Sequence, residues 1–333
     1  MSEAEFTVSF AGPLVTFQDG GRRGHMRYGV TASGPMDRLS FDAAHAALGN
    51  VAGQTAIEIS LGGLALTCTA GAVTFAMTGG DFVVEHRGQK HSAWCVLSVE
   101  KGDRVFIRGG KTGSWAYLAF AGSVAVPPWL GSTATHAASG FGGGTLQTGQ
   151  TIRIAKATIH EDRAGDIQQP DFMRDGPVRV VPGPQDQHFT QDALDRFMAE
   201  RFTVTDAYDR MGMRLSGPDL PLKEALSIPS EPIVRGSVQV SGDGVPTVLL
   251  ADHQTTGGYP KIATVIAPDI DRLVQYRSGQ SLRFTALSGA DAIAAARTYL
   301  AQKAAYLEQI AIPRGTLDQR LMRENLIHGC FPE

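Results

Sequence analysis

A dense run of polar residues follows a short apolar strand near residue 250. The strand, Thr247 to Ala251, leads into Asp-His-Gln-Thr-Thr at 252–256, then a glycine pair, Tyr259 and Lys261. Carboxylate, amide, hydroxyl and ammonium groups around one loop have the composition needed to orient a small polar amide or carboxylate. The alternative is a turn satisfied by its own Asp and Thr side chains. The polar density favours a functional site.

Two further polar segments lie upstream in the same half of the chain. Arg210 and Arg214 could present planar donor forks to a carboxylate or phosphate, or pair with Asp209 or another protein carboxylate. Glu231 and Arg235 frame a turn into the strand from Ser237 to Val240. Either side chain enters the same pocket if that strand neighbours the strand at 247–251.

The N-terminal half has one comparable segment, at residues 18–37. Asp19, Arg22, Arg23 and Asp37 are interspersed there with five glycines. That density of fixed charge in a loop indicates a substrate or interface role, with a turn-rich surface segment as the equal alternative.

Several familiar site motifs are incomplete. Gly109-Gly-Lys-Thr112 lacks the earlier glycine of a phosphate-binding loop, because position 105 is Val, and a strand is predicted to follow it. We expect a hairpin turn there instead. His86 and His91 have no third ligand nearby, so we expect no metal site. There is no Gly-x-Ser-x-Gly nucleophile motif.

Short alternating apolar runs must position these segments. Runs such as 72–77, 103–108 and 151–154 stand between turn residues and predict a mainly β fold. Helices are predicted over 38–48 after an Asp37 cap, over 191–199 after Thr190, and over the alanine-rich stretch 291–309, with Ile293, Leu300, Ala304 and Leu307 as its apolar positions.

The chain of 333 residues is long enough for about two domains. A polar segment at 160–175 predicts a linker, so we expect an N-terminal β-barrel at 1–165, a second at 166–288, and a helix and tail at 289–333. A net charge of −3 argues against nucleic-acid or membrane partners. Three scattered cysteines, and the lack of a signal-like or spanning segment, predict a cytoplasmic protein.

Six segments together resemble a known family. They are FQDGGRRGHMRYGVTASGPMD, EISLGG, SGFGGG, VVPGPQ, DRMGMRLSGP and ADHQTTGGYPKIATV, in that order along residues 17–265. They resemble the biotin-dependent carboxyltransferase family, which includes allophanate hydrolase subunit 2 and the C subunit of 5-oxoprolinase. The resemblance implies a pair of cyclophilin-like β-barrels.

The resemblance implies three possible functions. The first is a subunit of an ATP-dependent 5-oxoprolinase, using ATP with Mg²⁺ in a complex with a Kip-inhibitor-like subunit (allophanate hydrolase subunit 1) and a LamB/YcsF-like subunit. The second is half of a urea-carboxylase-type carboxyltransferase. The third is a non-catalytic binder of a kinase-inhibitor protein. The length and the absence of an Ala-Met-Lys-Met-type tetrapeptide favour the first, with no biotin attached to this chain.

Roles for single residues follow from that resemblance and from side-chain chemistry. We expect Asp252 to orient the substrate amide or hold Mg²⁺, and Lys261 to act with it in catalysis. Among the substrate-binding residues, Gln254 and Thr255 would hydrogen-bond the substrate, and Tyr259 would close the pocket. Arg210 and Arg235, together with Lys261, would meet a substrate carboxylate or phosphate. Asp19, Arg22, Asp37 and Glu231 are expected at the substrate or at the partner interface.

Overall fold

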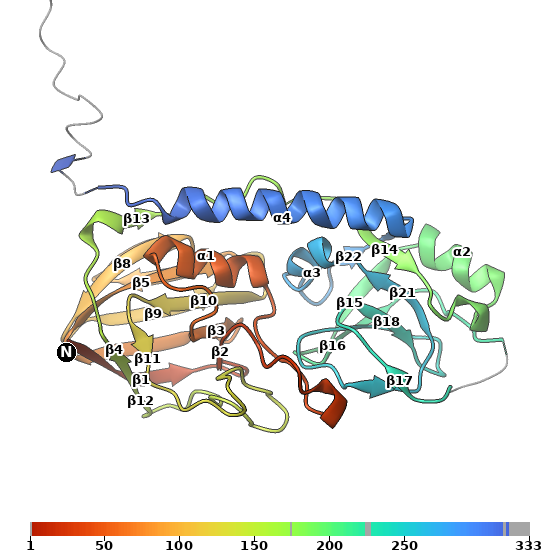
Figure 1. The fold of residues 1–333 in the computed structure, drawn as a ribbon, viewed down its shortest axis with the longest axis horizontal. Helices are drawn as coiled ribbons and strands as arrows, with labels where there is room; N and C mark the ends of the chain where they lie inside the picture. The colour runs from red at the N-terminus through yellow and green to blue at the C-terminus, as the bar shows by residue number, and fades with distance from the viewer. Residues whose placement is uncertain (1, 174, 224–227, 316–317, 320–333) are drawn as a thin grey trace, which may run out of the picture.

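Strands dominate the structure, which confirms the predicted mainly β fold. The computed structural model describes residues 2–173, 175–223, 228–315 and 318–319. Two β-rich lobes lie side by side, and one long helix runs across both (Figure 1). None of the helices in the described part of the chain has the length and hydrophobicity needed to cross a bilayer.

The N-terminal lobe contains two sheets. The first has the order β11-β12-β1-β4-β9-β6-β7. Its strands are β1 (Glu3–Ala11), β4 (Leu64–Ala70), β6 (Phe82–His86), β7 (Gln89–Ser92), β9 (Arg104–Gly109), β11 (Ser123–Val124) and β12 (Thr151–Ala155). The second has the order β13-β8-β5-β10-β3-β2. Its strands are β2 (Thr16–Gln18), β3 (Ala56–Ser60), β5 (Ala72–Gly79), β8 (Cys95–Glu100), β10 (Trp115–Phe120) and β13 (Gly165–Asp166).

The C-terminal lobe is a nearly closed barrel of one sheet. Its order is β22-β15-β16-β19-β18-β21-β14-β23. The strands are β14 (Val178–Pro182), β15 (Phe202–Tyr208), β16 (Gly212–Ser216), β18 (Ser237–Val240), β19 (Pro246–Leu249), β21 (Lys261–Val265), β22 (Ser281–Leu282) and β23 (Phe284–Ala286). The two edge strands, β22 and β23, are separated by one residue, so the chain itself brings the sheet edges together. A small ribbon of β17 (Glu231–Pro232) and β20 (Thr256–Gly257) adjoins it.

The helices begin and end where their capping residues predict. Helix α1 (Arg38–Leu48) begins after Asp37, whose carboxylate accepts from the Ser40 amide, and ends at Gly49 with a φ of 70°. Helix α2 (Gln191–Ala199) follows a Thr190 cap. Helix α4 (Gly289–Ala311) follows a Ser288 cap and extends two residues beyond the prediction at each end. Helix α3 (Ala267–Leu273) was not predicted. The described residues also form three short 3-10 turns: η1 (Met26–Tyr28), η2 (Glu161–Arg163) and η3 (Asp186–His188).

The apolar positions predicted for the last helix do not all face the protein. Ile293 and Leu300 are 56% and 63% exposed, whereas Tyr306 is 7% exposed. The hydroxyl of Tyr306 donates to the Gln168 carbonyl at 2.7 Å, and Lys303 pairs with Asp42 of α1 at 2.7 Å. Tyr306 and Lys303 therefore attach α4 to the body, together with Leu307 and Ile310, which pack against the N-terminal core.

The segment at 109–114 is a connection between the two N-terminal sheets and not the predicted hairpin turn. It joins β9 of one sheet to β10 of the other, and no helix follows it. Arg277 of the C-terminal lobe donates to the carbonyls of Gly110, Thr112 and Gly113 at 2.7–3.0 Å. The segment therefore joins the lobes, because its carbonyls accept hydrogen bonds from Arg277. A phosphate ligand is not needed to explain its conformation.

Each lobe has its own hydrophobic core, with contributions from outside. The N-terminal core is built mainly from residues 4–167 and includes Tyr306 of α4. The C-terminal core is built mainly from residues 178–284 and includes Met36 and Trp115. The predicted domain boundaries at 165/166 and 288/289 stay predictions. The short strand β13 spans the first of them.

Candidate functional site

A buried charge network connects the lobes where three of the polar segments meet. Arg210, on the turn between β15 and β16, donates to both carboxylate oxygens of Asp252, at 2.8 and 2.9 Å. The same guanidinium donates to Glu58 of β3 and to the Gly34 carbonyl. Asp252 also accepts from the Ala137 amide at 3.0 Å. All three charged side chains are at most 1% exposed.

Electrostatics favours the charged forms of Arg210 and Asp252. Burial opposes ionisation of Asp252, but the guanidinium of Arg210 holds the pKa of that carboxyl below its usual value. Burial would lower the pKa of Arg210, yet Asp252 and Glu58 raise it. The group thus has one buried cation between two buried anions. Such a set stabilises the fold only while every partner is present.

The substrate contact predicted for Arg210 stays a prediction, and the structure shows its protein partners. Its guanidinium meets protein carboxylates, which was the structural alternative, but Glu58 and Asp252 replace Asp209 as partners. Asp209 instead accepts from the amides of Met211 and Gly212 within its own turn. Both oxygens of Asp252 are likewise occupied by protein donors. Arg210 and Asp252 therefore position the loops around them.

Residues 19–37 also make hydrogen bonds at the junction, the boundary between the two lobes. Asp19 accepts from the Ser132 hydroxyl and the Thr133 amide, at 2.6 and 2.7 Å. Asp37 caps α1 and accepts from Gln275 of the other lobe at 2.8 Å. Burial, followed by the nearby Asp271, raises the pKa of Asp37 to about 6. The predicted residues of this segment therefore hold loops and lobes together.

Arg235 approaches that segment from the C-terminal lobe. Its guanidinium donates to the carbonyls of Pro35, at 2.9 Å, and Met36. Burial, followed by the nearby Arg38, lowers the pKa of Arg235 to about 10. In the structure Arg235 contacts the backbone of residues 35–36, and its predicted substrate contact stays a prediction.

Gln254 and Tyr259 do line a common groove, of about 330 Å³, on the C-terminal lobe. Gln239 of β18 joins them: it accepts from the Gln254 amide and donates to the Tyr259 carbonyl, each at 3.3 Å. Tyr259 is 45% exposed. Thr255 contributes through its carbonyl, which accepts from the Ile233 amide at 3.1 Å. The groove thus offers amide donors and acceptors beside an accessible aromatic ring.

Lys261 lies next to this groove. It is the register partner of Gln239 across β18 and β21, so the two side chains are close neighbours. Its side chain is 4% exposed, and its ammonium lies 3.6 Å from the carboxylate of Glu231, which is 52% exposed. No described group makes a hydrogen bond to that ammonium. Gln185 completes the cluster by donating to Glu231 at 2.6 Å and accepting from the Lys261 amide.

The structure therefore divides the predicted site into two parts. Gln254 and Tyr259 line the groove, and Lys261 pairs with Glu231 beside the groove residue Gln239, whereas Asp252 faces the junction with Arg210. Sequence reasoning missed Glu58, Gln185 and Gln239. A signal existed for Glu58, because a charge inside the apolar run Ala56–Ser60 requires a buried partner. Gln185 ends the VVPGPQ motif, and Gln239 is a polar residue in a strand that is buried throughout.

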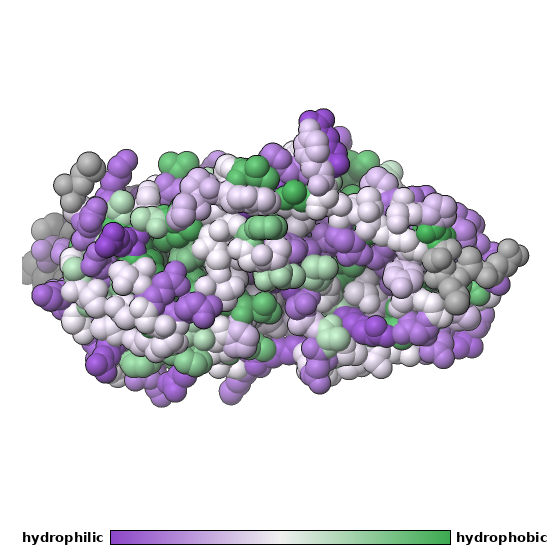
Figure 2. All heavy atoms as spheres, turned by 90° about the horizontal axis from the view of Figure 1, so that it is seen from below, coloured by the Kyte–Doolittle hydropathy of each residue, from purple (hydrophilic) through white to green (hydrophobic). Residues whose placement is uncertain are grey.

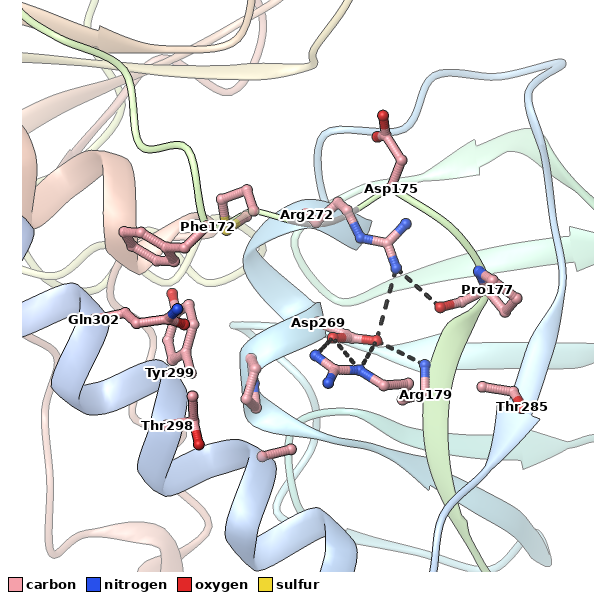
Figure 3. A pocket seen from close by; sticks show the side chains of 13 residues that line it. Phe172, Asp175, Pro177, Arg179, Asp269, Arg272, Thr285, Thr298, Tyr299 and Gln302 are labelled. Carbon is pink, nitrogen blue, oxygen red and sulfur yellow. Dashed lines mark hydrogen bonds and ion pairs between the residues drawn. The ribbon is translucent and has the colours of Figure 1, made fainter.

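A larger cavity of about 430 Å³ lies under α4 (Figure 3). Arg179 and Asp269 are joined there by several hydrogen bonds, the shortest 2.5 Å, and Asp175 points away from the pair (Figure 3). Arg272 donates to the carbonyls of Gly176 and Pro177. Because protein partners already meet these charges, we consider the cavity a weaker candidate than the groove.

Comparison with known proteins gives a consistent result. The family described as carboxyltransferase domain, subdomain A and B, matches residues 28–286. The C subunit of 5-oxoprolinase from Haemophilus influenzae is 34% identical over 298 residues, covering 89% of this chain and 94% of that protein. The protein of the same name from Escherichia coli K12 is 33% identical, covering 90% of this chain and 96% of its own length.

Larger proteins share the same region. Urea amidolyase of Saccharomyces cerevisiae is 27% identical over 84% of this chain, which corresponds to 16% of that protein. The crystal structure of Kluyveromyces lactis urea carboxylase superposes with a TM-score of 0.81, covering 94% of this chain and 30% of that one. At 23% identity, that likeness establishes the fold alone.

Proposed function

Since this chain belongs to the carboxyltransferase domain family of subdomains A and B, we propose that it is a subunit of an ATP-dependent 5-oxoprolinase. The observation that carries the proposal is its similarity to two 5-oxoprolinase C subunits over at least 89% of this chain and 94% of theirs. In this function it activates the lactam of 5-oxo-L-proline for hydrolysis to glutamate. It works in a complex with a Kip-inhibitor-like subunit and a LamB/YcsF-like subunit.

The chemistry needs charge and positioning more than a protein nucleophile. A lactam carbonyl is stabilised by resonance and resists water. Transfer of a phosphoryl group from ATP to the carbonyl oxygen creates a leaving group and an electrophilic carbon, and ADP is released. Water then attacks that carbon, the ring C–N bond breaks as the nitrogen takes up a proton, and a second water hydrolyses the resulting acyl phosphate to glutamate and phosphate. Such transfers depend on oriented donors and cations.

The groove supplies groups of the required kind. The amides of Gln239 and Gln254 can hydrogen-bond to the carbonyl and N–H of a lactam, and Tyr259 provides an apolar wall. The buried ammonium of Lys261 would stabilise negative charge on the lactam oxygen or the phosphoryl group. Glu231 holds that ammonium in place. Asp252 acts through Arg210, by fixing the loop that leads to Gln254.

The nucleotide site is assigned to the interface between subunits. The described residues contain no group of three or more His, Cys, Asp or Glu side chains able to hold a metal ion. Mg²⁺ would therefore enter on the phosphates of ATP and be completed by groups of the Kip-inhibitor-like partner. The LamB/YcsF-like subunit would carry the hydrolytic step.

ADP release in the reconstituted complex of all three subunits tests this function. We expect ADP to form on addition of 5-oxo-L-proline, and Lys261→Ala to lower that rate by about 10²-fold because charge stabilisation is lost. Lys90→Ala, on the edge strand β7, is the matched control and should retain the wild-type rate. If Lys261→Ala and Gln254→Ala both assemble normally and leave the rate unchanged, the groove is not the reaction site.

A urea-carboxylase-type transfer is the second candidate. The family description and the 27% identity to urea amidolyase favour it. It predicts carboxylation of urea by carboxybiotin carried on another protein, with no ADP release on 5-oxo-L-proline. A third outcome, a stable complex with the Kip-inhibitor-like protein but no turnover of either substrate, would indicate a non-catalytic binder.

A further inference from the structure

A small pocket lies on the N-terminal lobe, close to the junction. Its volume is about 180 Å³, and residues 22–31 and 129–141 line it. The rings of Trp129 and Phe141 stack with their centroids 4.6 Å apart. Viewed from the face opposite α4, hydrophobic residues lie in small groups among hydrophilic ones (Figure 2), so a single broad apolar interface does not dominate this face.

Arg22 is the unusual member of this pocket. Its side chain is 1% exposed and its guanidinium carbon lies 4.6 Å from the centre of the Trp129 ring. Nε donates to the Trp129 carbonyl, and Nη2 donates to the carbonyls of Ser132 and Ala134, at 2.9–3.2 Å. Nη1, although buried, has no hydrogen-bond partner among the described residues.

Arg22 also lacks a direct ion pair within the described part of the chain. Among the described residues no carboxylate lies within 4.0 Å of its guanidinium, whereas Arg210 contacts two. Burial lowers the pKa of Arg22, while the nearby carboxylates of Asp19 and Asp252 raise it without touching the guanidinium. Both carboxylates already accept hydrogen bonds from other donors. A buried cation held only by neutral carbonyls is costly unless an anion meets it.

The remaining polar groups of the pocket suit an anion. Nδ1 of His136 accepts from the Ser139 amide at 3.2 Å and lies 2.7 Å from the Ser139 hydroxyl, so the neutral ring carries its proton on Nε2. Thr31 donates to the Ala251 carbonyl at 3.4 Å, which links the pocket to the loop that holds Asp252. No acidic side chain lines the pocket.

We propose that this pocket binds the carboxylate of a small organic acid, with the Arg22 guanidinium as the charged group and the Trp129–Phe141 pair against its apolar part. The size limits the ligand to one ring or a short chain, and the aromatic walls favour a planar one. The site is separate from the Lys261 groove. It stands on its own geometry and does not require the 5-oxoprolinase activity, although 5-oxo-L-proline belongs to the same class.

Direct titration of the full chain, without ATP or partner subunits, tests this inference. The probes are benzoate, 5-oxo-L-proline, its uncharged analogue 5-oxo-L-prolinamide, and inorganic phosphate. Binding is followed by calorimetry and by the indole N–H resonance of Trp129. We expect at least one carboxylate to bind saturably and shift that resonance, and the carboxamide to bind at least tenfold more weakly than the matching acid.

Variants then locate the site. Arg22→Met should weaken carboxylate binding at least tenfold, whereas Lys90→Ala, on the edge strand β7, should leave it unchanged. If Arg22→Met does not fold, Phe141→Ala replaces it, because Phe141 is 53% exposed and its loss should weaken binding without unfolding. Binding of benzoate but not of 5-oxo-L-proline would support the pocket and count against the proposed substrate.

Four results would each overturn the inference. They are saturable binding by neither carboxylate, binding by phosphate alone, equal affinity for the acid and its carboxamide, and unchanged affinity in folded Arg22→Met or Phe141→Ala.

Discussion

Glu58 of the N-terminal lobe and Arg210 of the C-terminal lobe form an ion pair across their boundary, although 152 positions separate them in sequence. Their side chains are 0% and 1% exposed. Glu58 also accepts from the Tyr117 hydroxyl and the Met36 amide, both at 2.8 Å. The relative position of the lobes is therefore fixed by charged groups that water does not reach.

Breaking this pair should be costly. Glu58→Gln removes the buried negative charge and leaves Arg210 partly uncompensated. We expect a loss of about 3–5 kcal/mol in the free energy of unfolding, measured by urea titration. Asp243→Asn, which breaks the exposed pair with Arg214, is the control and should cost less than about 1 kcal/mol. Equal midpoints for Glu58→Gln and wild type would show that the pair does not stabilise the junction.

Arg277 makes a second connection between the lobes, and its removal should loosen one segment. Arg277→Ala deletes three hydrogen bonds to the carbonyls of residues 110–113. Amide hydrogen exchange in 109–114 should accelerate at least tenfold, with little change in the strands of either lobe. Arg108→Ala, which removes an exposed pair with Glu85, should leave exchange at 109–114 unchanged. Faster exchange at 109–114 in Arg108→Ala but not in Arg277→Ala would show instead that β9 orders this segment.

His45 should make the protein sensitive to acid. Burial lowers its pKa to about 4, from a value near 6.5 in the unfolded chain. Between these values the unfolded state binds more protons, so this residue's contribution to stability is lost as the pH falls from about 6.5 to 4. His45→Gln should reduce the difference between urea midpoints at pH 7 and pH 5. His91→Gln, on the edge strand β7, should retain it. An unchanged difference in His45→Gln would assign the sensitivity to other groups.

The space around Gly257 leaves no room for a side chain. An added Cβ would lie 2.5 Å from Cδ1 of Ile233 and 2.7 Å from Nε2 of Gln239. Gly257→Ala should therefore displace the Gln239 amide, lower kcat/KM of the complex at least tenfold, and cost about 1–3 kcal/mol of stability. At Gly289 no atom lies within 4 Å of the added Cβ, so Gly289→Ala should be neutral or slightly stabilising. Normal kinetics in Gly257→Ala would exclude Gln239 from substrate binding.

Local signals in the sequence predicted the helices well. Asp37 and Gly49 marked both ends of α1, and Thr190 marked the start of α2, because capping depends on side chains within a few residues. The mainly β fold and the family resemblance are also confirmed. Helix α3 was missed because it spans only seven residues and follows a strand without a side-chain cap.

The contacts at the site could not be predicted from the sequence, because they join residues that are far apart along the chain. Nothing in the sequence near Arg210 indicates that its partners lie at positions 58 and 252, because antiparallel folds bring distant segments together by topology. The polar residues at 252–261 were recognised as a cluster, but all of them were predicted to surround one cavity. A sharp change of direction after Asp252 sends its neighbours to a different surface.

The burial of Tyr306 in the N-terminal core has a consequence for biosynthesis. A ribosome makes a chain from its N-terminal end, so residues 4–167 of this core are all polymerised before the Tyr306 side chain exists. The N-terminal lobe therefore lacks one aromatic core contact while the C-terminal lobe is translated and folds. Release of the final helix from the exit tunnel is therefore the event that completes the lobe made first.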